Sequence, residues 1–226
     1  MWIILVWIIS GLCYMPLYFQ KIGYQVPGIL ALGKYIFVFV PLIISLVYLG
    51  KASIKKWIYS LITHKARFGI IGIIIVVACT GIIGTYIFDK VALNGIINPF
   101  SMGYLFIMAL IEECAWRGFR LEQLQTKRCA ILIVSLEWAL WHIPMWVIRN
   151  SQGLIDVCVW IVYTVLVGII LGKCMTWYKN ILAIAVLHTT FNVCFLMPVK
   201  GKVVAALCLV IVLVVFEKIR GMNGVR

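Results

Sequence analysis

The feature that most constrains this chain is its division into eight apolar runs, each of roughly the length that crosses a lipid bilayer. A helix needs about 20 mainly apolar residues to span the hydrocarbon core, and shorter runs span it where the bilayer thins. In lipid such a run must satisfy its own backbone hydrogen bonds, which favours helices. We therefore predict an all-α, polytopic membrane protein with about eight transmembrane helices, at 2–19, 35–50, 68–88, 100–118, 130–148, 154–172, 181–197 and 203–217.

The composition excludes an ordinary soluble domain. Of the 226 residues, 65% are apolar and only 12% are charged, and the mean hydropathy of +1.11 lies far outside the range of soluble proteins. No repeat or soluble segment interrupts the pattern, so we predict a single membrane domain over residues 1–226. We expect the first apolar run to be retained, because no basic segment precedes it.

Membrane topology explains the net charge of +13 better than nucleic acid does, because the basic residues lie between the apolar runs. If the 51–67 loop is cytoplasmic, 14 of the 20 Lys and Arg residues fall on the cytoplasmic side. We predict a multi-pass protein of the cell membrane, with both termini cytoplasmic, membrane lipid around it and no nucleic-acid partner. The eight Cys residues include no C-x-x-C pair, and we interpret them as free, membrane-buried apolar side chains.

Two of the seven acidic residues stand together near the end of the fourth predicted helix, as Glu112-Glu113. A charge at mid-bilayer costs about 2.5–3.5 kcal/mol, so an acidic pair here needs a reason. Glu113 and Arg117 have the spacing of a helical ion pair. Glu112 points about 100° away from Glu113 and is free to face a cavity. The alternative is a charge cluster at the membrane surface, whose side chains extend to the headgroups.

Two of the three histidines also lie inside predicted helices. His142 is in the fifth, and His188 is in the seventh with Asn192 on the same helical face. A single membrane histidine is more often a hydrogen-bonded packing residue. Two of them, with an asparagine and a diglutamate on separate helices, indicate a water-holding cavity. We interpret His64, in the basic loop, as a surface residue.

These side chains suit the hydrolysis of an amide bond inside the membrane. Glu112 would act as a general base toward water, and His142 would share that water. His188 and the Asn192 amide would donate to the oxyanion of the tetrahedral intermediate. In a second scheme Glu112, His142 and His188 would hold zinc, with water in the open position. Both schemes stay open at this stage.

Three motifs occur in order along the chain: Glu112-Glu113-Cys-Ala-Trp-Arg117, Trp138-Ala-Leu-Trp-His142 and His188-Thr-Thr-Phe-Asn192. Together they resemble the CPBP, or Abi, family of CAAX prenyl endopeptidases and bacteriocin-processing membrane proteins. The resemblance covers about residues 100–197, which we expect to be the catalytic core. It departs from the family pattern at Trp138, where phenylalanine is usual.

The resemblance implies roles for six residues. Glu112 would be the base assisted by His142, Glu113 and Arg117 the supporting pair, and His188 with Asn192 the oxyanion-binding face. Family members are described both as metalloproteases and as metal-independent glutamate proteases. We favour the metal-independent reaction, which requires no cofactor, and keep zinc on Glu112, His142 and His188 as the alternative.

We therefore expect an intramembrane, CAAX-protease-like endopeptidase that cleaves a hydrophobic peptide or a membrane-protein segment. The small size and the Ile- and Lys-rich composition are typical of bacterial proteins. They favour peptide maturation or bacteriocin self-immunity over a prenylated substrate. Two alternatives from other classes are a small ion- or proton-coupled transporter and a catalytically silent immunity or scaffold protein. The transporter is disfavoured because no inverted repeat is visible.

The sequence positions also impose a geometric requirement. His142 lies about 14 residues from Arg128, or roughly 21 Å along a helix, against about half that depth for Glu112 and His188. For these side chains to meet, the fifth helix must begin outside the bilayer or tilt strongly. Glu137 is expected to be a helix-packing polar residue or an indirect support of the site.

Overall fold

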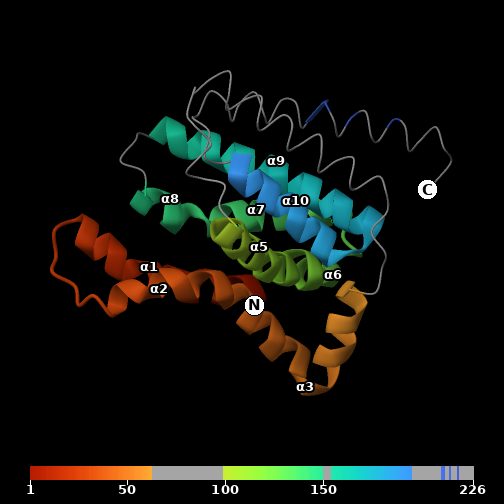
Figure 1. Ribbon diagram of the computed structural model, residues 1–226, viewed down its shortest axis with the longest axis horizontal. Helices are drawn as coiled ribbons and strands as arrows, with labels where there is room; N and C mark the ends of the chain where they lie inside the picture. The colour runs from red at the N-terminus through yellow and green to blue at the C-terminus, as the bar shows by residue number, and fades with distance from the viewer. Residues whose placement is uncertain (63–98, 150–153, 195–209, 212–213, 215–217, 219–226) are drawn as a thin grey trace.

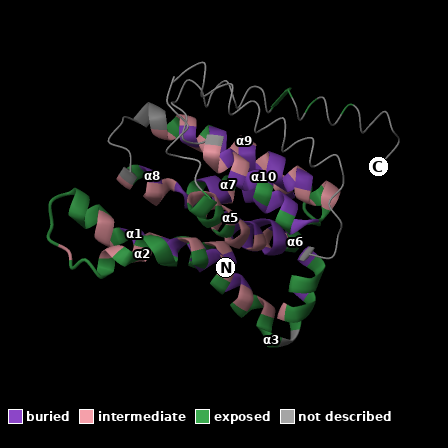
Figure 2. Cartoon of the chain, in the orientation of Figure 1, coloured by how far each residue is buried: buried purple, intermediate pink, exposed green. Residues whose placement is uncertain are grey.

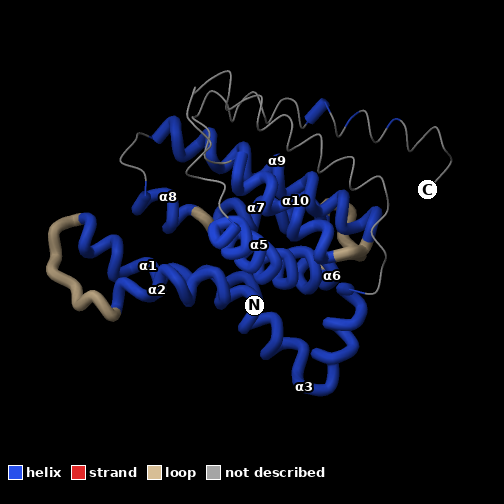
Figure 3. The backbone as a smooth tube through the Cα atoms, viewed as in Figure 1, coloured by secondary structure: helices blue, strands red, loops and turns tan. Residues whose placement is uncertain are grey.

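The computed structural model describes residues 1–62, 99–149, 154–194, 210–211, 214 and 218 (Figure 1). Every regular element within these ranges is helical, and they contain no β-strand (Figure 3). The prediction of an all-α class is therefore confirmed. Two predicted transmembrane helices, at 68–88 and 203–217, lie wholly or largely outside the described residues.

The helical elements follow one another closely along the described chain. In order they are α1 (Trp2–Lys21), η1 (Leu30–Leu32), α2 (Gly33–Ile36), η2 (Phe37–Phe39), α3 (Val40–Ile62), α5 (Pro99–Glu113), η4 (Cys114–Arg120), α6 (Leu121–Gln123), α7 (Ala130–Trp141), α8 (Ile143–Arg149), α9 (Leu154–Tyr178) and α10 (Ile181–Cys194).

Four helical segments are long and apolar enough to cross a membrane: Trp2–Lys21, Leu30–Lys51, Ala130–Ile148 and Val157–Tyr178. They overlap the predicted spans at 2–19, 35–50, 130–148 and 154–172. The predicted span at 181–197 corresponds to the shorter apolar helix α10. The polytopic membrane class is thus confirmed, whereas the count of about eight is not fixed by the described residues.

Helices α5, α7, α9 and α10 form the centre of the molecule (Figure 1). Helix α7 packs along α9 and α5 packs along α10, while α1 and α2 lie side by side and extend away from this centre. Burial follows the same arrangement, because the buried residues gather on the central helices and the outer faces of α1 and α3 are largely exposed (Figure 2). The exposed side chains on those faces are mainly large and apolar, as expected for a protein whose solvent is lipid.

Small residues allow α7 and α9 to approach closely. A Cβ atom added to Gly168 would lie 2.8 Å from the Cβ of Ser135, and one added to Gly172 would lie 2.8 Å from Ile131 Cγ2. The two glycines are four residues apart on α9, and they face two residues four apart on α7. Such glycine pairs let membrane helices pack at short range.

The helix that carries the diglutamate changes character directly after it. Helix α5 ends at Glu113 and continues as the π-helical element η4. Within η4, the carbonyl of Gly118 accepts a hydrogen bond from the indole of Trp57 at 3.1 Å. A Cβ atom at Gly118 would lie 2.9 Å from Leu61, so the missing side chain lets α3 approach η4. π-helical turns are frequent at functional sites.

Residues 51–62 differ from the loop that we predicted at 51–67, whose last five residues lie outside the described part of the chain. Helix α3 breaks at Gly50, where φ is +67°, and resumes as helix to Ile62. Glycine adopts this left-handed backbone conformation without the steric cost of a Cβ atom. The resumed segment buries Trp57 and Leu61 against η4 and leaves its lysines exposed.

Candidate functional site

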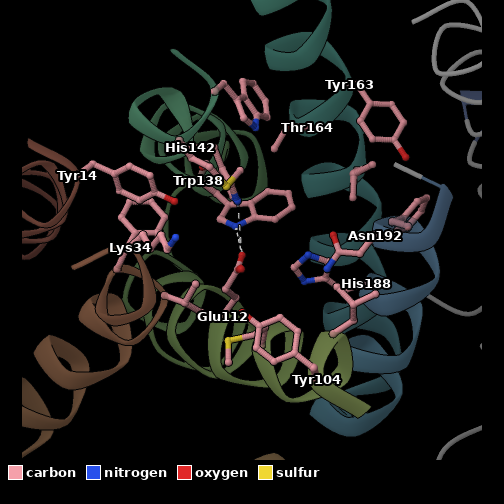
Figure 4. A pocket seen from close by; sticks show the side chains of 18 residues that line it. Tyr14, Lys34, Tyr104, Glu112, Trp138, His142, Tyr163, Thr164, His188 and Asn192 are labelled. Atoms are coloured by element: carbon pink, nitrogen blue, oxygen red, sulfur yellow. Dashed lines mark hydrogen bonds and ion pairs between the residues drawn. The ribbon is translucent and has the colours of Figure 1, made fainter. Parts of the chain in front are cut away.

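The polar side chains predicted to meet come from three parts of the helical centre. Glu112 and Glu113 end α5, and Arg117 lies one turn later in η4. His142 follows the last residue of α7, whereas His188 and Asn192 lie four residues apart on α10. Figure 4 shows Glu112, His142, His188 and Asn192 around one cavity.

His142 reaches the site because α7 ends directly before it. The backbone N–H of His142 bonds to Ala139 O rather than continuing the regular i−4 pattern. Pro144 has no N–H to donate and cannot extend that ladder. The carbonyl of Trp138 is left to accept a bond from Nδ1 of His142 at 2.8 Å. Because a carbonyl only accepts, Nδ1 carries the proton and Nε2 of the neutral ring is bare.

The side chain of Glu112 lies between Trp138 and His142. Its Oε2 accepts a hydrogen bond from Nε1 of Trp138 at 2.9 Å. The same oxygen lies 3.7 Å from Nε2 of His142. That distance is too long for a direct hydrogen bond, and it is one that a single water molecule can bridge.

Glu113 and Arg117 form the ion pair expected from their spacing. Glu113 Oε1 lies 2.9 Å from Arg117 Nη1 and 2.8 Å from His188 Nδ1. Arg117 also reaches Gly168 O at 3.5 Å and lies over the ring of Trp138 at 4.4 Å. Glu113 is 0% and Arg117 2% exposed. A buried charge is tolerated when it is paired and hydrogen-bonded, as this one is.

The ring of His188 is oriented by Glu113. A carboxylate can only accept, so the 2.8 Å contact fixes the proton of the neutral ring on Nδ1. Nε2 of His188 can then donate a hydrogen bond only when the ring is doubly protonated. The oxyanion-binding role that the sequence suggested for His188 therefore requires an imidazolium, with Glu113 as its counter-charge.

The cavity has a volume of about 240 Å³ and is mostly apolar. Of the six predicted site residues, Glu112, His142, His188 and Asn192 line it, whereas Glu113 and Arg117 lie behind its wall and outside its lining. The remaining lining is contributed by α1, α2, η2, α5, α7, α8, α9 and α10, and includes the aromatic side chains Tyr14, Phe37, Tyr104, Trp138, Trp146, Tyr163 and Phe191.

The difference in depth that the sequence positions imply does not separate the predicted site residues. The side chains of His142 and Glu112 lie 3.7 Å apart, although the two residues lie at different distances along their helices from the expected cytoplasmic ends. Glu137 lies away from the cavity and pairs with Arg120 at 2.6 Å, which joins α7 to η4. It is thus a helix-packing residue, one of the two roles that the sequence suggested.

Sequence reasoning missed two features of the cavity. The sequence marked Trp138 only as a departure from the family pattern, whereas its indole N–H donates a hydrogen bond to Glu112. Lys34, an exposed residue of α2, also lines the cavity and lies near its Glu112 wall in Figure 4. The five-residue spacing of the Trp138 motif could have suggested the first. No local signal pointed to the second, because residues 34 and 112 meet only through the tertiary fold.

The zinc alternative requires Glu112, His142 and His188 to converge. Among the described residues no group of three His, Cys, Asp or Glu side chains is arranged to hold a metal ion. The indole of Trp138 lies against both imidazoles, with ring centroids 5.0 Å from His142 and 5.2 Å from His188, and its N–H is bonded to Glu112 Oε2. In this arrangement the donor set does not fit zinc.

The cysteines described by the structure take no part in the site. Cys13, Cys114, Cys129, Cys158 and Cys174 are free thiols, in agreement with the prediction that bridges do not hold the fold. Cys174 is buried within the protein, whereas Cys129 and Cys158 lie exposed on its surface.

The fold and the site together define an all-helical membrane protein with a polar cluster inside its helical body. Residues 94–194 match the family model of type II CAAX prenyl endopeptidases, Rce1-like. A curated relative, CAAX prenyl protease 2 of Methanococcus maripaludis, is 26% identical over 99 residues, which make up 39% of this chain and 36% of the relative. Over less than half of this chain, both matches agree with the resemblance to CAAX proteases that the three motifs carry. The match spans only about a third of the relative's length.

Proposed function

We propose that this chain is an intramembrane endopeptidase that hydrolyses a peptide bond in a hydrophobic or membrane-associated peptide or protein. The observation that carries the proposal is one cavity lined by Glu112 of α5, by His142 at the end of α7, and by His188 and Asn192 of α10. Its acidic and basic groups are positioned to act on one water molecule and one carbonyl. The CAAX protease family supports the same class of activity.

Glu112 acts as the general base in this proposal. A water molecule bound between Glu112 and the bare Nε2 of His142 donates to both, and its oxygen points toward the substrate carbonyl. Glu112 takes a proton as the water oxygen bonds to the carbonyl carbon. The same proton then passes to the leaving amine as the C–N bond breaks. General-base catalysis of this kind contributes typically about 10²–10⁴-fold in rate.

The opposite wall of the cavity stabilises the oxyanion. The Asn192 amide and protonated His188 donate to the negative oxygen that forms on the substrate carbonyl. Glu113 and Arg117 do not touch the substrate. They hold His188 in place and balance its charge, which explains why such an expensive ion pair is kept inside the protein.

The proposed substrate is a hydrophobic peptide or a membrane-protein segment, because most of the cavity lining is apolar. Because the relative is named a CAAX prenyl protease, a peptide with a prenylated C-terminus is the second substrate to test. We place the reaction in a bacterial cell membrane, with peptide maturation or bacteriocin self-immunity as the role. The proposed reaction needs no cofactor.

Purified protein in lipid vesicles tests the proposal with two substrates, a prenylated C-terminal peptide and an unprenylated hydrophobic peptide. Mass spectrometry of the products should show endoproteolytic cleavage by the wild type. Glu112→Gln should lower kcat at least 100-fold, because the amide cannot accept the proton. Glu122→Gln, a change at an exposed carboxylate of α6, should leave kcat unaltered.

Four outcomes would contradict parts of the proposal. Proton-coupled solute uptake without cleavage would favour a transporter, and neither uptake nor cleavage would favour a silent immunity or scaffold protein. Full cleavage by Glu112→Gln would remove Glu112 as the base. Loss of activity with a chelator and recovery with zinc would replace the metal-free reaction by the metal-dependent one.

A further inference from the structure

Trp138 contacts four of the charged or titratable groups at the centre of the site, namely Glu112, Arg117, His142 and His188. Its indole N–H donates to Glu112, and its ring lies beneath the guanidinium of Arg117 at 4.4 Å. The same ring contacts His142 and His188 edge-on, with centroid distances of 5.0 and 5.2 Å. Trp138 is 3% exposed, so its position is fixed by packing on all sides.

The indole bond gives the two oxygens of Glu112 different environments. Oε2 accepts the Trp138 N–H at 2.9 Å, in a buried setting where hydrogen bonds to charged acceptors are strong. An indole N–H can donate but not accept, so the carboxylate oxygen is the acceptor of this bond. The bond fixes the plane of the Glu112 carboxylate.

The backbone of the same residue orients the partner of Glu112. The Trp138 carbonyl accepts Nδ1–H of His142 at 2.8 Å, which leaves Nε2 bare and directed at Glu112. One residue therefore holds both groups that would share the water, Glu112 through its side chain and His142 through its main chain. The carbonyl contact would survive any substitution of the side chain, whereas the N–H contact belongs to tryptophan alone.

We propose that Trp138 is a positioning residue whose indole N–H holds the Glu112 carboxylate in its reactive orientation. This inference rests on the proposed function of Glu112 as a base. A phenylalanine at this position could supply an aromatic ring but not this hydrogen bond.

The charged and titratable groups around Glu112 come from several elements. Glu113 and Arg117 lie on the same helix and its π-helical continuation, His142 follows α7, and His188 lies on α10. Lys34 of α2 lines the same cavity. Because the ring of Trp138 contacts Arg117, His142 and His188, a substitution must keep the ring shape to isolate the effect of the lost N–H.

The activity test compares wild type with Trp138→Phe and with 3-benzothienylalanine placed at residue 138, which keeps the shape of tryptophan and replaces its N–H by sulfur. We expect both to lower kcat about 10- to 100-fold with KM changed less than threefold. The loss should appear in kcat rather than in KM, because the N–H orients the base and does not bind the substrate.

Trp2→Phe is the matched control. Trp2 is 2% exposed, and its indole also donates a buried hydrogen bond, to Ser45 Oγ at 3.2 Å, away from the cavity. This variant should retain the wild-type kcat even if it is less stable. An unchanged kcat in the benzothienyl variant, or the same loss of kcat in Trp2→Phe, would overturn the inference.

A second readout does not need turnover. In protein with ¹⁵N-labelled tryptophan, the indole signal of Trp138 is identified by its loss in Trp138→Phe. That signal should shift in Glu112→Leu, which removes the acceptor, and should not shift in Glu122→Gln. A Trp138 signal indifferent to Glu112→Leu overturns the inference even if peptides are cleaved. A responsive signal in a protein that cleaves no peptide supports the contact and counts against the proposed function alone.

Discussion

At the scale of single residues, the site depends on a buried carboxylate with more than one donor. Glu113 is fully buried, and its Oε1 lies within 2.9 Å of both the Arg117 guanidinium and the His188 ring. A buried pair of this kind adds little to stability compared with an apolar pair, but losing one partner leaves a charge without compensation. We therefore expect the Glu113–Arg117 ion pair to serve in orienting His188 rather than in stabilising the fold.

Arg117→Met tests this account. The variant leaves the Glu113 carboxylate in the protein interior without its guanidinium, so we expect a loss of about 3–5 kcal/mol in the free energy of unfolding. Arg120→Met breaks the less buried pair with Glu137, and should cost about 1 kcal/mol or less. Denaturant unfolding in detergent, followed by circular dichroism, compares the two. Equal losses would contradict the distinction between them.

Asn192 should matter for chemistry but not for stability. If its amide donates to the oxyanion, Asn192→Ala should lower kcat by about 10²–10³ with little change in KM, because the bond forms in the transition state. Thr190→Ala serves as the control on the same helix, since Thr190 donates to Val186 O and does not line the cavity. A rise in KM at constant kcat would instead assign Asn192 to substrate binding.

At the scale of helices, the site is built where regular helical structure ends or changes. The π-helical element η4 begins directly after Glu113, and α7 stops one residue before His142. The close packing of α7 against α9 fixes the distance between these two places, because Gly168 both contacts Ser135 and offers its carbonyl to Arg117.

Gly168→Ala should therefore push α7 and α9 apart. Its Cβ would lie 2.8 Å from the Cβ of Ser135, which belongs to a stiff part of the side chain. We expect a destabilisation of about 1–3 kcal/mol, typical of overpacking, together with reduced activity. Gly103→Ala is the matched control in α5, since nothing lies within 4 Å of the added atom. The measurement is thermal unfolding of both variants in detergent. Equal melting temperatures would show that the added Cβ atom at Gly168 does not clash with Ser135.

At the scale of the whole molecule, the described helices present large apolar side chains outward and gather their buried charged groups at one interior site. The exposed basic residues set the expected orientation. Lys51, Lys55 and Lys56 are exposed on the helical segment of α3 that follows Gly50. The positive-inside rule predicts that this segment lies in the cytoplasm.

A reporter protein fused to either terminus should confirm the predicted orientation. A fluorescent protein that matures only in the cytoplasm should be bright at both ends of the chain. The same reporter inserted after Gln25, between α1 and α2, should be dark, because that loop lies on the opposite side in the predicted topology. Fluorescence at the loop and none at the termini would reverse the orientation.

The sequence determined by itself the membrane class, the helical fold and the identity of the six polar side chains. A chain this apolar must be solvated by lipid, where few backbone structures satisfy their hydrogen bonds. Charged side chains are costly in lipid, so those found inside apolar runs are easily recognised as site candidates. The spacing of Glu113 and Arg117 predicted their ion pair because both lie on one helix.

Only the tertiary structure decided the contacts between helices. The hydrogen bond from Trp138 to Glu112 joins residues 26 apart, and the break at Gly50 turned an expected loop into a packed helix. The periodicity of the sequence does not predict contacts between helices, because these depend on where small residues let helices approach and where helices end. The sequence thus identified the charged groups. The packing decided which of them face the cavity and which nitrogen of each histidine carries the proton.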